Sequence, residues 1–353
     1  MATYLVRRFL QLIIVVLLAT IVIYALLNAA PGGPLSGLRQ QAAGSGVTAA
    51  DIAADIARLE KDFDLDLPLH QRYLRWLIGW PKLEGRENRG GIVFGDLGTS
   101  WTVARGQSVA SLIQSRLGNT LLLMAAATLL SLLVAIPIGI YSAVRQYSTF
   151  DYLATFFAFF GVAMPVFWFG MMMIMVFAFY FKQQGWVYLP TGNAVALRPY
   201  DVPILGTITP ETILDRVLHL ILPTIVLGLL YMASWSRYTR SSMLEVLRQD
   251  YVRTARAKGL VERLVIAKHA LRNALIPLVT IVALQVPSLF GGAILTETVF
   301  NWPGMGRLYI SGLNSSDWPL VMSLLFITVV LTVFANLLAD VLYTVVDPRI
   351  RLT

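Results

Sequence analysis

The chain has 353 residues, of which 57% are hydrophobic and only 14% are charged. This composition is typical of proteins that cross a membrane several times. The sequence has no cysteine, which excludes disulfides, thiol nucleophiles and thiolate metal sites. The formal net charge of +8 would also suit a nucleic-acid-binding protein, but the basic residues cluster between apolar runs, where membrane orientation explains them better.

Residues 1–29 predict a first transmembrane helix. Its apolar run, residues 9–28, follows two arginines and is long enough to span a bilayer, whereas the core of a signal peptide is usually about 7 to 15 residues. We therefore expect an uncleaved helix that starts in the cytoplasm. Cleavage after the small residues Ala29 and Ala30 is the minor alternative.

Residues 30–116 form the longest polar region and predict a partly helical loop on the outer face. Thr48 can cap a helix whose apolar side chains recur every three or four residues. These side chains are Ile52, Ile56, Leu59 and Phe63. A second short helix is expected from Leu69 to Trp80, with aromatic residues suited to a membrane interface.

Residues 117–353 predict a transmembrane domain of five further helices. Their apolar runs cover about residues 117–143, 152–181, 217–235, 275–295 and 319–345. With the first helix they give six spans, so the expected fold class is an all-α membrane protein with both termini on one side. Segments predicted to be cytoplasmic hold 14 Lys and Arg, against 4 in the two shorter outer loops, which places both termini in the cytoplasm.

Prolines and one glutamine inside the spans are candidate pathway positions. Pro165 lies in the third expected span, and Gln285 and Pro287 lie in the fifth. Each proline removes a backbone donor, so these helices are expected to bend within a bundle and to shape a central pathway. Ordinary kinked packing explains the same residues equally well.

Three further polar residues fall near span ends. Glu297 fits either an outer gate or an anchor at the membrane interface. Asn336 and Asp340 lie in the last span. A structural polar contact explains these two better than a functional site does, because Asp340 lies within two turns of the cytoplasmic end.

Residues 236–274 form a strongly basic loop between two apolar runs. The loop holds nine Lys and Arg against three acids. Its spacing predicts two short amphipathic helices, the first beginning near Ser242, with a corner at Gly259. Glycine accepts the left-handed geometry of a helix stop at little cost. Composition alone also fits an ordinary positive loop beside anionic lipid.

The motifs in this loop resemble those of a known family. TARAKGL at 254–260 and HALRNALIP at 269–277 resemble the cytoplasmic loop of bacterial ATP-binding-cassette importer permeases of the dipeptide, oligopeptide and nickel group. FGDLGTSW at 94–101, TETVFNWPGMG at 296–306 and the C-terminal NLLADVLY and DPRI are similar to the same family. The resemblance is firm from Gly95 onward and looser between Ser36 and Phe94.

In that family the loop carries the coupling helix that fits a cleft on an ATPase subunit. Arg253, Thr254 and Ala255 stand where the general signature has Glu-Ala-Ala, and Gly259 stands on its glycine. The resemblance implies that the coupling residues are Arg253, Thr254, Ala255, Ala257, Lys258, Gly259, Leu260, Glu262 and His269. The glutamate of the signature is absent, as it commonly is in the peptide branch.

The resemblance also implies an architecture and partners. The fold expected is that of a type I importer permease, and the chain would be the B-type member of a permease pair. Its partners would be a homologous second permease, two ATPase subunits and an external substrate-binding protein. ATP and Mg²⁺ would bind to the ATPases and no cofactor to this chain, which would open and close by alternating access.

The absent motifs are consistent with a non-catalytic subunit. The sequence has no GxxxxGK[ST] phosphate loop and no HExxH or GxSxG motif. With only three histidines, a multi-histidine nickel site is unsupported. Peptides are the favoured substrate, and oligosaccharides or a nickel chelate are alternatives. A self-contained channel or secondary transporter and a membrane scaffold also remain open.

Overall fold

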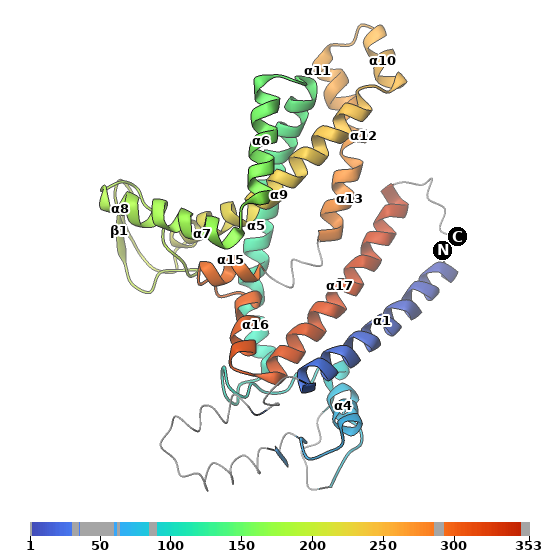
Figure 1. Ribbon diagram of the computed structural model, residues 1–353, viewed down its shortest axis with the longest axis vertical. Coiled ribbons are helices and arrows are strands. Elements are labelled where there is room, and N and C mark those ends of the chain that lie inside the picture. Colours follow the sequence, from blue (N-terminus) through green and yellow to red (C-terminus); the bar gives the residue numbers. More distant parts are fainter. Residues whose placement is uncertain are drawn as a thin grey trace. The chain divides into compact units, whose positions relative to one another are not determined.

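The computed structural model describes residues 2–29, 35, 60–61, 64–84, 90–285 and 293–346 (Figure 1). The chain divides into two compact units. Among the described residues, the first unit contains those up to Gly118 together with Arg307–Phe334, and the second contains Asn119–Gly306 together with those from Ala335 to Val346.

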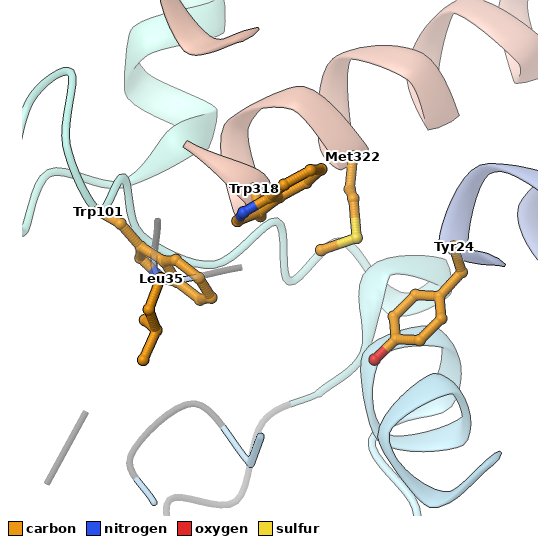
Figure 2. Packing of buried hydrophobic residues seen from close by; sticks show 5 residues of the cluster. All are labelled: Tyr24, Leu35, Trp101, Trp318 and Met322. Atoms are coloured by element: carbon orange, nitrogen blue, oxygen red, sulfur yellow. The ribbon is translucent and has the colours of Figure 1, made fainter. Parts of the chain in front are cut away.

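The first unit is built on aromatic packing between its helices. Its elements are α1 (Ala2–Ala29), α4 (Leu69–Ile78), the 3₁₀ turn η1 (Ile92–Phe94), most of α16 (Met305–Asn314) and the start of α17 (Trp318–Val346). The buried core consists of Tyr24, Leu35, Trp101, Trp318 and Met322 (Figure 2). Helix α4 confirms the short helix expected from Leu69 to Trp80, although it ends two residues earlier, at a left-handed Gly79. The expected Thr48-capped helix lies outside the described residues.

The second unit contains the remaining elements. They are α6 (Thr149–Ala163), α7 (Val166–Met173), the π-helical η2 (Ile174–Tyr180), α8 (Phe181–Gln183), β1 (Tyr200–Val202), β2 (Gly206–Ile208), α9 (Ile213–Val246), α10 (Asp250–Ala257), α11 (Glu262–Leu264), η3 (Val265–Ala270), α12 (Leu271–Ala274), α13 (Ile276–Gln285) and α15 (Ile294–Val299). Helix α5 (Val109–Val144) begins in the first unit and continues in the second.

The third expected span, residues 152–181, is not one helix. Helix α6 ends at Ala163, and α7 starts at Val166 and turns sharply away from it (Figure 1). Pro165 causes the break, because it has no backbone N–H and forces the preceding Met164 into an extended conformation, with φ −77° and ψ 125°. The prediction of a single span bent at Pro165 is therefore wrong, because one helix ends before this proline and another begins after it.

The helices have the lengths that a multispanning membrane protein requires. Five described segments are long and apolar enough to cross a bilayer: Arg7–Ala29, Val109–Val144, Val166–Gln183, Ile213–Val246 and Trp318–Leu337. A sixth span results if Glu262–Ala274 and Ile276–Ala283, which meet at 41°, are counted together. Helix α6 is apolar but has only 15 residues. The all-α class is confirmed, with one small exception, the antiparallel hairpin β1–β2.

Candidate functional site

The basic loop folds into two helices joined by a glycine corner. Helix α10 ends at Ala257, and Gly259 adopts φ +76°. The N–H of Gly259 donates to the carbonyl of Arg256 (2.9 Å), and the N–H of Leu260 donates to the carbonyl of Ala255 (3.4 Å). These two bonds form a Schellman motif, which ends a helix with a residue in the left-handed conformation. The predicted corner is confirmed, and its geometry explains why glycine is present.

The start of the first loop helix differs from the prediction. We expected the helix to begin near Ser242, but α9 continues to Val246 and α10 begins at Asp250. Asp250 stands in the first turn of α10, where a negative charge interacts favourably with the helix dipole and stabilises the helix start.

A small apolar core holds the corner together. Val252 and Val265 are fully buried and Ala255 is nearly so, and Val246 and Leu247 at the end of α9 pack against them. The apolar spacing thus serves to join the two loop helices to each other and to α9. It also accounts for the buried position of Ala255.

Most of the residues implied by the resemblance lie on the surface of the corner. Ala255 is buried and His269 is half-buried. The exposed members are Arg253, Thr254, Ala257, Lys258, Gly259, Leu260 and Glu262. The structure therefore brings this set onto one compact surface, which we call the corner surface. Docking of an ATPase subunit on the corner surface stays a prediction.

One ion pair spans the corner. The guanidinium of Arg256 donates to both carboxylate oxygens of Glu262, at 3.1 and 2.7 Å. The hydrogen bond from Arg256 holds the pKa of the Glu262 carboxyl below its ordinary value. Because both side chains are more than a third exposed, the pair contributes little stability.

The second loop helix connects the corner to two membrane helices. Ala270 and Ala274 are fully buried against Met243 of α9 and Ala143 of α5. The small side chains allow the helix axes to come close. Farther along the contact of α5 with α9, which we call the seam, a Cβ added to Gly139 of α5 would lie 2.5 Å from the Cβ of Thr239 and 2.7 Å from the carbonyl oxygen of Ser236, so the backbone of α5 lies directly against α9 there. Movement of the corner surface would therefore reach α5 and α9 through tightly packed atoms.

The sequence did not predict a buried ion pair that lies next to this seam. Arg240 of α9 donates to both oxygens of Asp151, at 2.6 and 2.8 Å, and Asp151 is 2% exposed. Asp151 stands in the first turn of α6, where Ser148 caps the helix by accepting its N–H. The Ser-x-x-Asp spacing signals a helix start, but no local signal reveals the partner 89 residues away.

The candidate pathway residues are scattered among different environments. Pro165 is exposed at the break between α6 and α7, and Gln285 is half-buried at the end of α13. Pro287 lies outside the described residues. Asn336 is exposed on α17, and Asp340 lies in the same helix with its side chain outside the described part. Their roles in a pathway or in polar contacts stay predictions.

Glu297 is a buried carboxylate of the second unit. It is fully buried and accepts a hydrogen bond from the Thr120 hydroxyl at 2.9 Å. The N–H of Met305 in turn donates to the Thr120 oxygen at 2.7 Å. Gly304 has no side chain, which leaves room for the carboxylate: an added Cβ would lie 2.5 Å from its carbon and both oxygens. The segment 296–306 thus encloses the carboxylate of Glu297. The role of Glu297 at an outer gate stays a prediction.

The motif at 94–101 has a structural explanation in the first unit. Asp317 is fully buried, and one of its oxygens accepts the Ser100 hydroxyl at 2.5 Å and three consecutive N–H groups at 3.0 to 3.1 Å. These N–H groups belong to Trp101, Thr102 and Val103. The end of the motif and the two residues that follow it therefore form a backbone nest that holds the start of α17.

Comparison with known proteins covers the whole length of the chain. Residues 135–352 match the family described as "Binding-protein-dependent transport system inner membrane component", and residues 1–124 match its N-terminal model. The oligopeptide transport system permease protein AppB of Bacillus subtilis is 43% identical over 99% of this chain and 100% of its own length. The dipeptide transport system permease protein DppB of Escherichia coli K12 is 38% identical over 94% of each chain. The di/tripeptide transport system permease protein DppB of Pseudomonas aeruginosa is 36% identical over 99% of each chain.

Proposed function

Because the chain belongs to the binding-protein-dependent transport system inner membrane component family, we propose that it is the permease subunit of an ATP-driven peptide importer. It forms half of the translocation pathway and pairs with a homologous second permease. Two cytoplasmic ATPases bind ATP and Mg²⁺, and an external binding protein delivers the substrate. Both termini lie in the cytoplasm, as the distribution of Lys and Arg supports.

Peptides are the proposed substrate class because the similar relatives are named for dipeptide, di/tripeptide and oligopeptide transport. The substrate class is tested by mass spectrometry of the ligand retained by the co-purified binding protein. A mixture of peptides is expected. An oligosaccharide or a metal chelate would overturn the assignment.

The observation that carries the coupling role is the corner surface around Gly259. Its backbone is fixed by the Schellman bonds, while basic and small side chains such as Lys258 and Ala257 remain exposed. A rigid, exposed element whose buried side packs on α5 and α9 suits a part that an ATPase moves. In the proposed mechanism the ATPase contacts this surface differently before and after ATP binding, and the difference biases the bundle between its two states.

The test replaces Gly259 with valine. At φ +76° a β-branched residue is strained by about 1–2 kcal/mol, which depopulates the docked geometry by about 5- to 30-fold. A Cβ at this position meets no atom within 4 Å, so the strain is in the backbone alone. ATP hydrolysis stimulated by loaded binding protein is measured in the assembled transporter in liposomes. We expect Gly259→Val to insert normally and to lose most of the stimulation.

Gly185 offers a matched control. It has φ +71°, also has open space around its missing Cβ, and lies in the loop between α8 and β1. Gly185→Val therefore carries the same backbone strain away from the corner surface. We expect its stimulated hydrolysis to stay within twofold of that of the unmodified transporter. Equal activity of the Gly259→Val and unmodified transporters would contradict the coupling role.

A further inference from the structure

A cavity in the first unit has no role in the proposed transport mechanism. It lies between the end of α1, helix α4, the 94–101 motif and the start of α17. Its volume is about 90 Å³, enough for about six water molecules or one aromatic ring. Tyr24, Trp101 and Trp318 form aromatic walls, and Met322 adds a flexible apolar surface (Figure 2). Trp76 lines the same cavity.

Two residues that line this cavity carry a buried hydrogen-bond donor that has no acceptor among the described residues. The donors are the indole Nε1 of Trp318 and the Nε of Arg72. Trp318 is 8% exposed, and Figure 2 shows its indole nitrogen on the side of Trp101 and Leu35. Buried donors almost always have partners, so two donors that find none among the described residues, both on residues that line one cavity, indicate an acceptor supplied by a bound molecule.

The carboxylates that line the cavity are already engaged. Asp64 accepts from the Nε of Arg75 at 2.7 Å. Asp96 accepts the N–H groups of Gly90 and Gly98 at 2.9 and 3.1 Å. Arg72 therefore supplies a positive charge that these two acids are not positioned to neutralise by hydrogen bonding. A cationic ligand is disfavoured, and a purely apolar ligand would leave both donors unpaired.

We propose that this cavity binds a small carboxylate with an apolar or aromatic body. The carboxylate accepts from Arg72 and from the indole N–H of Trp318, and the body lies between the aromatic walls. A charge-assisted hydrogen bond to a guanidinium is stronger than one between neutral groups, so Arg72 contributes most of the selectivity for the acid. This proposal does not rest on the proposed transport function. Ligand binding is measured on this chain without its partners, so the two proposals can fail separately.

The test uses calorimetry on the full chain in lipid nanodiscs. The probes are 3-phenylpropionate, its uncharged amide 3-phenylpropionamide, and octanoate. We expect the acid to bind at least about tenfold more tightly than the amide, because the amide carbonyl can still accept from Arg72 but carries no negative charge, so the charge-assisted part of the bond is lost. Tighter binding of 3-phenylpropionate than of octanoate identifies an aromatic acid, such as the last residue of a peptide. The reverse order identifies a fatty acid, and both results support the site.

Variants separate the site from general effects on folding. Arg72→Gln is expected to weaken acid binding by about tenfold and to weaken amide binding much less. Arg72→Lys keeps the charge and is expected to restore part of the affinity. Trp318→Phe keeps an aromatic ring and removes the donor, with a loss of about threefold to tenfold.

Arg105→Gln is the matched control, because Arg105 is an exposed arginine of the same unit and does not line the cavity. Its affinity for the acid should stay within twofold of that of the unmodified chain. Equal binding of acid and amide would overturn the proposal. So would an unchanged affinity in Arg72→Gln, or a calorimetric trace with no binding of any probe.

Discussion

The buried carboxylate of Asp317 is predicted to hold the outer-face motif against α17. Asp317→Ala removes the acceptor for the Ser100 hydroxyl, for three consecutive N–H groups, and for the N–H of Leu320 at 3.4 Å. The hydroxyl and the N–H groups of Trp101 and Leu320 are buried. At about 1 kcal/mol each, the low end for an unsatisfied buried donor, these three donors give a loss of about 3 kcal/mol.

The expected effect is local opening of residues 100–107. A loss of about 3 kcal/mol raises the open population about 150-fold. Asp317→Asn keeps one oxygen acceptor and loses the charge, so we expect an increase of only about tenfold. The order of the two variants is therefore part of the prediction.

Trypsin cleavage after Arg105 measures this opening. Arg105 is exposed, but a protease needs several extended residues around the bond, so cleavage follows the open population when closing is fast. Cleavage after the exposed Arg263 in the second unit is the internal standard, and Asp201→Ala, at an exposed hairpin carboxylate, is the control variant. An increase below threefold at Arg105 in Asp317→Ala, or an equal increase at Arg263, would refute the reasoning.

Two further predictions concern the second unit. Gly304→Ala is expected to lower the free energy of unfolding by about 1–3 kcal/mol, because the new Cβ overlaps the buried Glu297 carboxylate. Thermal unfolding measures this loss. Gly118→Ala is the control and should cause no loss, because a Cβ there meets nothing within 4 Å. Arg240→Gln is expected to lower stability by about 3–5 kcal/mol, since it leaves the carboxylate of Asp151 buried without its charge partner. Adding Asp151→Asn to Arg240→Gln should recover part of that loss in a double-mutant cycle, and simple additivity of the two single variants would count against a direct pair.

The glycine corner could be predicted because its signal is local. Gly259 separates two amphipathic patterns, and a left-handed helix stop is the conformation that glycine favours. The start of α10 was misplaced for an equally local reason. The apolar spacing around Leu244 continues that of α9, so nothing in the pattern separates the end of one helix from the start of the next.

The break in the third expected span shows a limit of composition. Residues 152–181 are apolar on both sides of Pro165, so a hydropathy pattern gives one span. A proline inside an apolar run predicts a bend, but whether the helix bends or ends depends on the contacts of the flanking segments. Here Gly170 of α7 packs against Phe300 and Val299, which fixes the direction of the new helix.

Long-range polar contacts could not be predicted from one sequence. The pairs Arg240–Asp151 and Asp317–Ser100 join residues 89 and 217 positions apart. Each acid has a local explanation as a helix-cap residue, and the choice of partner depends on how the helices pack. Of these four residues only Ser100 lies in a family-like motif, so the motifs do not reveal the partners and the structure is needed to identify them.

The arrangement of the loop explains how a weak surface contact can act on membrane helices. The Arg256–Glu262 pair is exposed and contributes little stability, yet the corner does not depend on it, because the Schellman bonds and the buried Val252 and Val265 fix the angle between the loop helices. In the proposed mechanism an ATPase grips a rigid element. The displacement of this element is then transmitted through Ala270 and Ala274 to the seam between α5 and α9. There Gly139 has no side chain that could change conformation and reduce the transmitted displacement. Rigidity at both ends of this path is what converts a local contact into motion of α5 and α9.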